Sequence, residues 1–373
     1  MDRIQTPRII DDLKKKMVFL AGPRQVGKTF IAKQIAAEYQ RPIYLNYDCV
    51  EHRDIIHSAA WLETTDLLVL DELHKMPDWK NYLKGIYDTR LEHLHILVAG
   101  SARLDIFDKI GDSLAGRYFL HRLLPFSPAE LKQLGESFHL EHLLERGGFP
   151  EPFLAENAVE ENRWRLQYIN SILATDIFEF EKVENIKALR ILFELLRMRI
   201  GSPISYQSLA EDVQVSPHTV KKYIEILEAL YIVFRVTPFS KNISRSLLKE
   251  PKIYFFDTGL VKGDEGVRLE NLAAVCLLKT VFAKVDYQAE NYALHYMRTK
   301  DQQEVDFVLV KDDAIEKIIE VKNSNGEISK SLYQFSKKYQ LSATQIVKNL
   351  RDERIMEGID VIKAQRFLEA LYL

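Results

Sequence analysis

The chain has 373 residues, of which 51 are basic and 54 acidic, and its formal net charge at pH 7 is −3. This length is too great for one compact core and predicts two or three domains. The near balance of charge excludes a global positive field, so any binding of nucleic acid must depend on local basic patches. No apolar stretch is long enough to cross a membrane, the N-terminus does not read as a signal peptide, and the two cysteines, Cys49 and Cys276, are not spaced as metal ligands. We therefore expect a cytoplasmic protein with no membrane partner.

A glycine-containing loop follows the first buried strand that the sequence predicts, Met17–Ala21. It reads Gly-Pro-Arg-Gln-Val-Gly-Lys-Thr, with two glycines, a lysine and a threonine at the spacing of a phosphate-binding loop. The glycines let backbone amides turn toward phosphates, and the positive end of the next helix, predicted over Phe30–Tyr39, holds the anion. A chance turn is the alternative, which the flanking strand and helix disfavour. The residues predicted to bind ATP here are Gly22, Pro23, Arg24, Gln25, Val26, Gly27, Lys28 and Thr29.

A second apolar run, Leu67–Leu70, ends in two carboxylates, Asp71 and Glu72. In P-loop hydrolases the first carboxylate at such a strand end holds Mg²⁺, and the next one orients or deprotonates the attacking water. We therefore expect Asp71 and Thr29 to be the magnesium residues and Glu72 to be catalytic. Lys28 is expected to reach the β- and γ-phosphates.

Strand-like and helix-like segments alternate along this part of the chain. Pro42–Tyr47 and His95–Ala99 read as strands before and after the Leu67–Leu70 run, and Asp78–Leu94 reads as a helix capped by Asp78. Such alternation indicates a parallel sheet with crossover helices. Residues 1–130 are therefore predicted to be an α/β P-loop ATPase domain.

Two polar residues outside the loop are further candidates. Ser101 follows the predicted strand His95–Ala99, where it would contact the γ-phosphate or position the water; a simple turn serine is the alternative. Arg117 precedes an extended Tyr118–Leu124, where it would reach a neighbouring subunit's nucleotide as an arginine finger. An exposed arginine without that role is the alternative, and Arg103 is the second candidate. The finger hypothesis implies a homo-oligomer.

Proline and glycine divide the middle of the chain. Pro125 and Pro128 interrupt the pattern after the predicted sheet, and Ser127 is placed to cap a new helix. Gly147-Gly148-Phe149-Pro150 is a second break. Residues 131–185 are interpreted as a helical connector.

Residues 186–240 read as a winged helix-turn-helix. The expected helices and the extended segment in the place of a wing are Ile186–Arg199, Ser205–Asp212, Ser216–Leu230 and Tyr231–Pro238. Basic side chains lie on the exposed side of the third helix and just beyond the wing, and they are His218, Lys221, Lys222, Lys241, Arg245, Lys249 and Lys252. They favour contact with nucleic acid, whereas a protein–protein spacer is the alternative.

Residues 241–373 carry a second chemical signal. Asp306 lies in a predicted strand, Gln303–Val310, and Glu320 and Lys322 lie two residues apart in the next, Ile315–Lys322, so their side chains share a face. The two carboxylates suit Mg²⁺, and Lys322 would stabilise or help deprotonate the attacking water. Glu270, on a predicted helix over Val267–Val281, would add a third carboxylate. The candidate metal residues are Glu270, Asp306 and Glu320, and the candidate catalytic residues are Asp306, Glu320 and Lys322.

Together these motifs resemble a prokaryotic family of AAA-type ATPases fused to a C-terminal domain of unknown function. The segments that carry the resemblance are Gly22–Thr29, Leu70–Glu72, Gly100-Ser101, Leu114–Arg117, Gly147–Pro150, Lys252–Leu260, Leu269–Leu272, Glu304–Phe307 and Glu320–Lys322. The resemblance implies an ATPase domain, a winged helix and a restriction-endonuclease-like α/β domain. It implies that Lys28, Thr29, Asp71 and Glu72 match the nucleotide and magnesium residues, and that Glu270, Asp306, Glu320 and Lys322 match the nuclease-like ones.

The sequence therefore predicts an ATP- and Mg²⁺-dependent ATPase that couples its nucleotide state to a winged-helix and nuclease-like module acting on nucleic acid. The rival hypothesis is an ATP-dependent signalling or assembly switch whose last domain binds without cutting. An intact set of Asp306, Glu320 and Lys322 favours the first, because a binding module does not need these residues.

Overall fold

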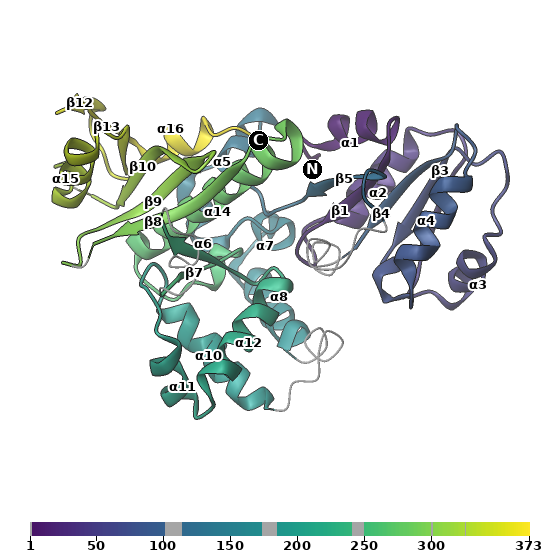
Figure 1. The fold of residues 1–373 in the computed structure, drawn as a ribbon, viewed down its shortest axis with the longest axis horizontal. Coiled ribbons are helices and arrows are strands. Elements are labelled where there is room, and N and C mark those ends of the chain that lie inside the picture. Colours follow the sequence, from purple (N-terminus) through teal and green to yellow (C-terminus); the bar gives the residue numbers. More distant parts are fainter. Residues whose placement is uncertain (1, 101–113, 174–184, 241–249, 300, 325) are drawn as a thin grey trace. The chain divides into compact units, whose positions relative to one another are not determined.

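The computed structural model describes residues 2–100, 114–173, 185–240, 250–299, 301–324 and 326–373. It divides into two compact units (Figure 1). The first comprises Met1–Leu124 with Ala229–Tyr231, and the second comprises Pro125–Glu228 with Ile232–Leu373.

The first unit is built on a parallel sheet of five strands in the order β2-β3-β4-β1-β5. The strands are β1 (Met17–Ala21), β2 (Pro42–Asn46), β3 (Leu67–Asp71), β4 (His95–Ala99) and β5 (Tyr118–Arg122). The helices are α1 (Thr6–Leu13), α2 (Lys28–Ala37), α3 (Val50–Ser58) and α4 (Trp79–Thr89), with a 3₁₀ turn η1 (Leu73–Lys75). The predicted α/β fold with a parallel sheet is confirmed, and β4 lies between β1 and β3.

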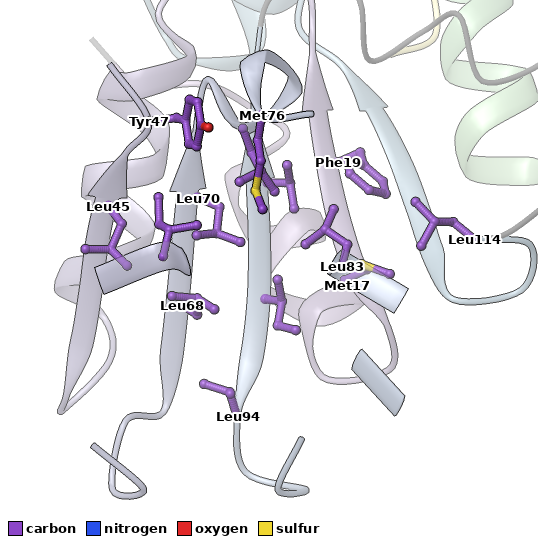
Figure 2. Close-up of a cluster of buried hydrophobic side chains, with 14 of the residues drawn as sticks. Met17, Phe19, Leu45, Tyr47, Leu68, Leu70, Met76, Leu83, Leu94 and Leu114 are labelled. Atoms are coloured by element: carbon purple, nitrogen blue, oxygen red, sulfur yellow. The ribbon is translucent and has the colours of Figure 1, made fainter. Parts of the chain in front are cut away.

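One face of this sheet packs into a continuous apolar core (Figure 2). Alternate residues of β1 and β3, among them Phe19, Leu68 and Leu70, contact Leu83 of α4, and all four side chains are buried. Each such side chain contributes about 1.5–3 kcal/mol relative to exposure. This packing fixes the carboxyl ends of β1 and β3 side by side with β4, so the segments that follow them meet at one edge of the sheet.

The start of α4 differs from its prediction. Asp78 precedes the helix but adopts a left-handed conformation with φ of 56° and makes no capping hydrogen bond, so the predicted cap is wrong. Its carboxylate instead accepts a hydrogen bond from the side-chain amide of Asn81 at 2.7 Å. The helix ends at Thr89, because Arg90 turns to an extended conformation.

The second unit begins with the predicted helical connector. Its helices are α5 (Pro128–Gln133), α6 (Leu140–Arg146), α7 (Pro150–Leu154) and α8 (Ala158–Ser171). The Ser127 hydroxyl accepts a hydrogen bond from the Glu130 amide at 3.4 Å, as a cap should. Gly147 and Gly148 separate α6 from α7, as the break in the sequence pattern indicated.

Three helices and an antiparallel strand pair follow. They are α10 (Ile186–Met198), α11 (Tyr206–Val213), α12 (Pro217–Ala229), β6 (Val233–Pro238) and β7 (Lys252–Phe255). Serines cap the second and third helices, because the hydroxyls of Ser205 and Ser216 accept hydrogen bonds from the Ser208 and Thr219 amides at 3.4 and 3.0 Å. Pro203, before α11, forms an isolated bridge to Lys252, which adds a short third strand segment beside β7.

The C-terminal part forms a mixed sheet of eight strands, in the order β12-β13-β11-β10-β9-β8-β6-β7 (Figure 1). Its remaining strands are β8 (Tyr292–Arg298), β9 (Glu304–Lys311), β10 (Ala314–Lys322), β11 (Ala343–Val347), β12 (Arg354–Met356) and β13 (Ile359–Lys363). The helices are α14 (Glu265–Gln288), α15 (Lys330–Tyr339) and α16 (Ala364–Glu369), and η4 (Thr258–Leu260) is a 3₁₀ turn. The predicted α/β C-terminal domain is confirmed in this coarse form.

Two details of this sheet depart from the sequence-based expectation. Helix α14 runs from Glu265 to Gln288, longer than predicted at both ends, and the Asp264 carboxylate caps it by accepting from the Val267 amide at 3.0 Å. Strand β6 pairs with both β7 and β8. The strand that was expected to form the wing is therefore continuous with the C-terminal sheet.

Within the described parts of the chain, none of the helices combines the length and apolar character needed to cross a bilayer. Cys49 and Cys276 are both free thiols.

Candidate nucleotide site and carboxylate cluster

The loop between β1 and α2 has the backbone conformation that phosphate binding requires. Gly22 adopts φ of 146°, and a Cβ placed there would lie 2.1 Å from the Leu123 carbonyl oxygen. Gly27 adopts φ of 101° immediately before α2 begins at Lys28. Only glycine occupies both positions without strain, and the loop leads directly into the N-terminus of α2, which is the end of a helix that favours an anion.

Lys28 is buried at the start of α2, where it curls back over the loop. Its ammonium donates to the carbonyl oxygens of Gly22 at 2.9 Å and Pro23 at 2.6 Å. Burial lowers the pKa of Lys28 to about 8, although the Glu72 and Asp71 carboxylates oppose the shift. A phosphate would give this buried ammonium the strong anionic partner that the loop carbonyls do not provide.

Asp71 collects three hydrogen bonds at the end of β3. One carboxylate oxygen accepts from the Thr29 hydroxyl at 2.9 Å and from the Tyr44 hydroxyl at 2.6 Å, and the other accepts from the Glu72 amide at 3.1 Å. The two predicted magnesium residues, Thr29 and Asp71, thus lie within hydrogen-bonding distance of each other. Tyr44, on β2, was not predicted. Asp71 is itself only 2% exposed, so these contacts hold it in one position.

Glu72 lies beside this pair in a left-handed conformation with φ of 55°. One of its carboxylate oxygens is buried without a hydrogen-bond partner and lies 3.6 Å from Nε2 of the buried His74. Burial raises the pKa of Glu72, while Lys28 acts in the opposite direction. This oxygen makes no hydrogen bond within the described residues, and it faces His74. The groups present therefore fit ATP and Mg²⁺.

The remaining candidates of the first unit are only partly described. Ser101 and Arg103 lie outside the described residues. The Gly100 amide donates to Leu20 of β1 at 3.2 Å, so the chain leaves β4 next to the phosphate-binding loop.

Arg117 lies at the end of the strands that is opposite to the phosphate-binding loop. Its carbonyl oxygen accepts a hydrogen bond from the Met17 amide at the start of β1. The loop follows the far end of that strand, about 13 Å away by strand rise. The guanidinium of Arg117 makes two hydrogen bonds to Asp88, at 2.8 and 3.0 Å. Arg117 is therefore not placed to contact the nucleotide of its own chain, and a finger acting on a neighbouring subunit stays a prediction beside the alternative of an arginine that only pairs with Asp88.

We predict that Arg117→Ala lowers ATP hydrolysis without weakening ATP binding, if subunits complete each other's sites. Asp88→Ala is the matched control, because it removes the same ion pair and keeps the arginine. Mixing Arg117→Ala with Glu72→Gln protein should restore activity, since one subunit supplies the arginine and the other the carboxylate. Hydrolysis that is independent of protein concentration and never rises on mixing would rule out a shared site.

The basic residues expected to contact nucleic acid fall into two groups. His218 and Lys221 are exposed on α12, and Lys222 beside them is partly exposed. Lys241, Arg245 and Lys249 lie outside the described residues. Lys252 was counted in the same surface stretch, and this was wrong, because its side chain is completely buried.

The Asp306, Glu320 and Lys322 side chains converge as predicted. Phe307 of β9 pairs with Ile319 of β10, so the next residues of the two antiparallel strands, Asp306 and Glu320, lie opposite each other on one face. One Asp306 oxygen accepts from the Val321 amide at 2.9 Å. The Lys322 ammonium lies 2.7 Å from the Glu320 carboxylate. This lysine is thus already an ion-pair partner.

Lys252 is an unpredicted member of the same cluster. Its ammonium lies 2.7 Å from Glu304, 3.5 Å from Glu270 and 3.6 Å from Asp306. Burial alone would lower the pKa of Lys252, but the three carboxylates raise it above its ordinary value. Burial and the nearby Asp306 charge raise the pKa values of Glu270 and Glu320 to about 7 each.

The expected metal set of Glu270, Asp306 and Glu320 is not assembled around one point. Among the residues that the structure describes, no group of three or more His, Cys, Asp and Glu side chains is arranged to hold a metal ion. The physical reason is that a lysine ammonium accompanies each part of the cluster: Lys252 faces Glu270 and Asp306, and Lys322 faces Glu320.

Two segments that carry the family resemblance, Lys252–Leu260 and Leu269–Leu272, hold this cluster together. The Asn271 side-chain amide donates to the Phe255 carbonyl at 2.9 Å and to the Thr258 hydroxyl at 3.1 Å, and its oxygen accepts from the Phe255 amide at 2.8 Å. These bonds join α14 to the end of β7. The neighbouring Glu270 accepts from the Tyr254 hydroxyl at 2.7 Å and so faces Lys252.

Among the family matches of this chain, only the one over the first unit is to a family of described type. Residues 14–132 match a family described as an AAA domain. Residues 137–267 and 266–367 match two families described as Domain of unknown function (DUF8612) and Domain of unknown function (DUF4143). The second boundary, near residue 266, falls at the start of α14.

Similar proteins come from bacteria and archaea. An uncharacterised protein of Mycobacterium tuberculosis is 28% identical over 252 residues, covering 66% of this chain and 55% of the relative. This chain thus spans about half the length of the mycobacterial protein. An uncharacterised protein of Methanocaldococcus jannaschii is 24% identical over 353 residues, covering 84% of this chain and 77% of that protein.

Among solved structures, a Walker-type ATPase of Pyrococcus abyssi is 14% identical, covers 72% of this chain and 95% of its own, and has a TM-score of 0.45. The family match over residues 14–132, the parallel sheet and the phosphate-binding loop agree with one another. Residues 14–132 are therefore an AAA domain with a phosphate-binding loop, and residues 266–367 match a family of unknown function.

Proposed function

We propose that the protein binds ATP with Mg²⁺, hydrolyses it, and couples its nucleotide state to the binding of nucleic acid by the second unit. The observation that carries the ATPase proposal is the arrangement of Thr29 and Tyr44 on Asp71, with an unpartnered Glu72 oxygen beside them. A purely structural network does not require a buried carboxylate oxygen without a hydrogen bond, and Glu72 has such an oxygen.

Each residue has a defined part in this proposal. Lys28 and the amides at the start of α2 bind the phosphates, and Thr29 and Asp71 hold Mg²⁺, which neutralises phosphate charge when bound. Glu72 orients the water and takes its proton on the unpartnered oxygen. Ser101, Arg24 and Gln25 are proposed to assist at the γ-phosphate or the loop, and Arg117 to act on a neighbouring subunit.

Contact with nucleic acid is proposed for α12 and its surroundings. The three helices α10, α11 and α12, followed by the β6–β7 pair, support a winged helix-turn-helix, in which the third helix enters the major groove. His218 and Lys221 on α12 are exposed and available for bases or phosphates. Since the net charge of the chain is −3, this local patch would have to supply the attraction.

The test is the affinity for labelled single- and double-stranded DNA and RNA, measured by fluorescence anisotropy. Lys221→Glu should weaken binding and reduce its dependence on salt. Lys337→Glu on α15 is the matched control, because Lys221 and Lys337 have similar exposed fractions, 56% and 51%, and each lies near one glutamate. Equal binding by the two variants would remove α12 from the interface.

The rival proposal is an ATP-dependent switch or assembly protein whose C-terminal domain binds a partner without cutting. Lys252 and Lys322 are paired with the carboxylates of the cluster, which favours a C-terminal domain that binds without cutting over one that cleaves with a metal ion. An assay for cleavage of DNA or RNA with Mg²⁺ or Mn²⁺, with and without ATP, tests whether the C-terminal domain cuts. Cleavage that Asp306→Ala abolishes while ATP hydrolysis persists would establish a nuclease.

A further inference from the structure

The strongest unexplained feature of the second unit is a lysine that is completely buried among acidic side chains. Lys252 is 0% exposed, and its ammonium lies within 3.6 Å of carboxylate oxygens from Glu304, Glu270 and Asp306. The Tyr296 ring lies 5.3 Å from the same nitrogen. A positive charge in this setting must be matched by nearby anions, and the cluster supplies them.

The position of this lysine follows from the fold and not from a flexible surface chain. Lys252 is the first residue of β7, where its backbone pairs with Val236 of β6 and bridges to Pro203. Asn271 joins the end of β7 to α14, which places Glu270 against the lysine. Glu304 and Asp306 alternate on β9, so both side chains reach the same face.

We propose that the Lys252 ammonium is the resident cation of this cluster and occupies the place that a divalent metal ion would take in a nuclease of similar layout. The space between the carboxylates of Glu270, Glu304 and Asp306 is therefore already occupied by a cation of the protein itself, which offsets one of their negative charges. In consequence the wild-type protein binds no divalent ion through Asp306 and cleaves no phosphodiester there.

The distances around the ammonium support this assignment. The three oxygens lie 2.7, 3.5 and 3.6 Å from the nitrogen, which is ion-pair distance for an ammonium. Mg²⁺ requires oxygens at about 2.0–2.1 Å, and Ca²⁺ at about 2.3–2.6 Å. An ion could not enter while the ammonium is present, because both positive charges would compete for the same oxygens.

This inference is independent of ATP hydrolysis, whose residues lie in the first unit. It rests on the rival proposal, in which the C-terminal domain binds without cutting, and gives a physical reason why that domain would not cut. Its failure would restore the C-terminal domain as a candidate metal-dependent nuclease, and it would leave the assignments of Lys28, Asp71 and Glu72 unchanged.

The experiment is a titration of nucleotide-free, full-length protein with Mn²⁺ and with Ca²⁺, followed by calorimetry and, for Mn²⁺, by electron paramagnetic resonance. Lys252→Met is the informative variant, because methionine keeps most of the side-chain stem and lacks the terminal ammonium. The cluster then holds carboxylates without a cation, which favours uptake of an ion. Binding at the cluster is defined as the part that an added Asp306→Asn substitution removes.

We expect the wild type and Asp306→Asn to bind the ions identically, and Lys252→Met to gain a site that Asp306→Asn abolishes. Lys279→Met is the matched control, because Lys279 is also buried and paired with a carboxylate, Glu130, away from the cluster. It should gain no site.

Two results would overturn the proposal. One is binding of Mn²⁺ or Ca²⁺ by the wild type that Asp306→Asn removes, which can be measured even if Lys252→Met does not fold. The other is a folded Lys252→Met protein with no gained site, since the carboxylates would then not be arranged for any cation other than the lysine.

Discussion

Glu72→Gln should lower the rate of ATP hydrolysis by about 10²–10⁴-fold, the usual range for loss of a general base. Glutamine keeps the size of the side chain but cannot accept the proton of the attacking water. The affinity for ATP should be unchanged, because Glu72 lies beside the phosphate-binding residues and is not expected to hold the phosphates. Steady-state hydrolysis and equilibrium binding of ATP measure the two effects separately.

Glu38→Gln is the matched control, because Glu38 is an exposed carboxylate at the end of α2, outside the site. It should hydrolyse ATP at the wild-type rate. If Glu72→Gln also does so, Glu72 has no part in the reaction, and the unpartnered oxygen beside His74 needs another explanation.

Lys28→Ala should abolish binding of ATP with Mg²⁺. The Lys28 ammonium is the loop cation that is expected to reach both the β- and γ-phosphates. In the wild type, ligand at 100 times its dissociation constant should stabilise the fold by roughly 2.7 kcal/mol. Thermal or chemical unfolding with and without ATP would reveal this stabilisation, and the variant should lack it.

Lys84→Ala provides the control for removing a lysine from the same domain, since Lys84 is exposed on α4. It should be stabilised by ATP as the wild type is. Stabilisation of Lys28→Ala by the same amount would contradict the assignment of the loop.

The sequence located the segments of the candidate nucleotide site because these segments are local. Gly22, Gly27 and Lys28 have fixed spacing in one loop, and Asp71 ends an apolar run; in the structure the loop lies between β1 and α2, and Asp71 ends β3. Tyr44 was missed although it lies two residues from the end of β2. Its bond to Asp71 depends on the neighbouring strands β2 and β3 pairing in register, which spacing along the chain does not encode.

Lys252 shows the opposite case. Its neighbours in the sequence include several basic residues, so it was assigned to a surface patch. It is also followed by Ile-Tyr-Phe-Phe, and a charge at the edge of such an apolar run needs a buried partner. This argument could have identified Lys252 as a buried residue. It could not have identified Glu304, Glu270 and Asp306 as the partners, because β9 and α14 contribute these side chains from distant positions.

The affinity of Glu72→Gln protein for nucleic acid, compared in ATP with Mg²⁺ and in ADP, tests the central claim most directly. The variant should remain in the ATP state, so the two nucleotide states can be compared at equilibrium. Coupling predicts different affinities in the two states and, by reciprocity, an equal factor by which nucleic acid changes the relative affinity for ATP and ADP. Absence of binding, or the same affinity in both states, would contradict the account.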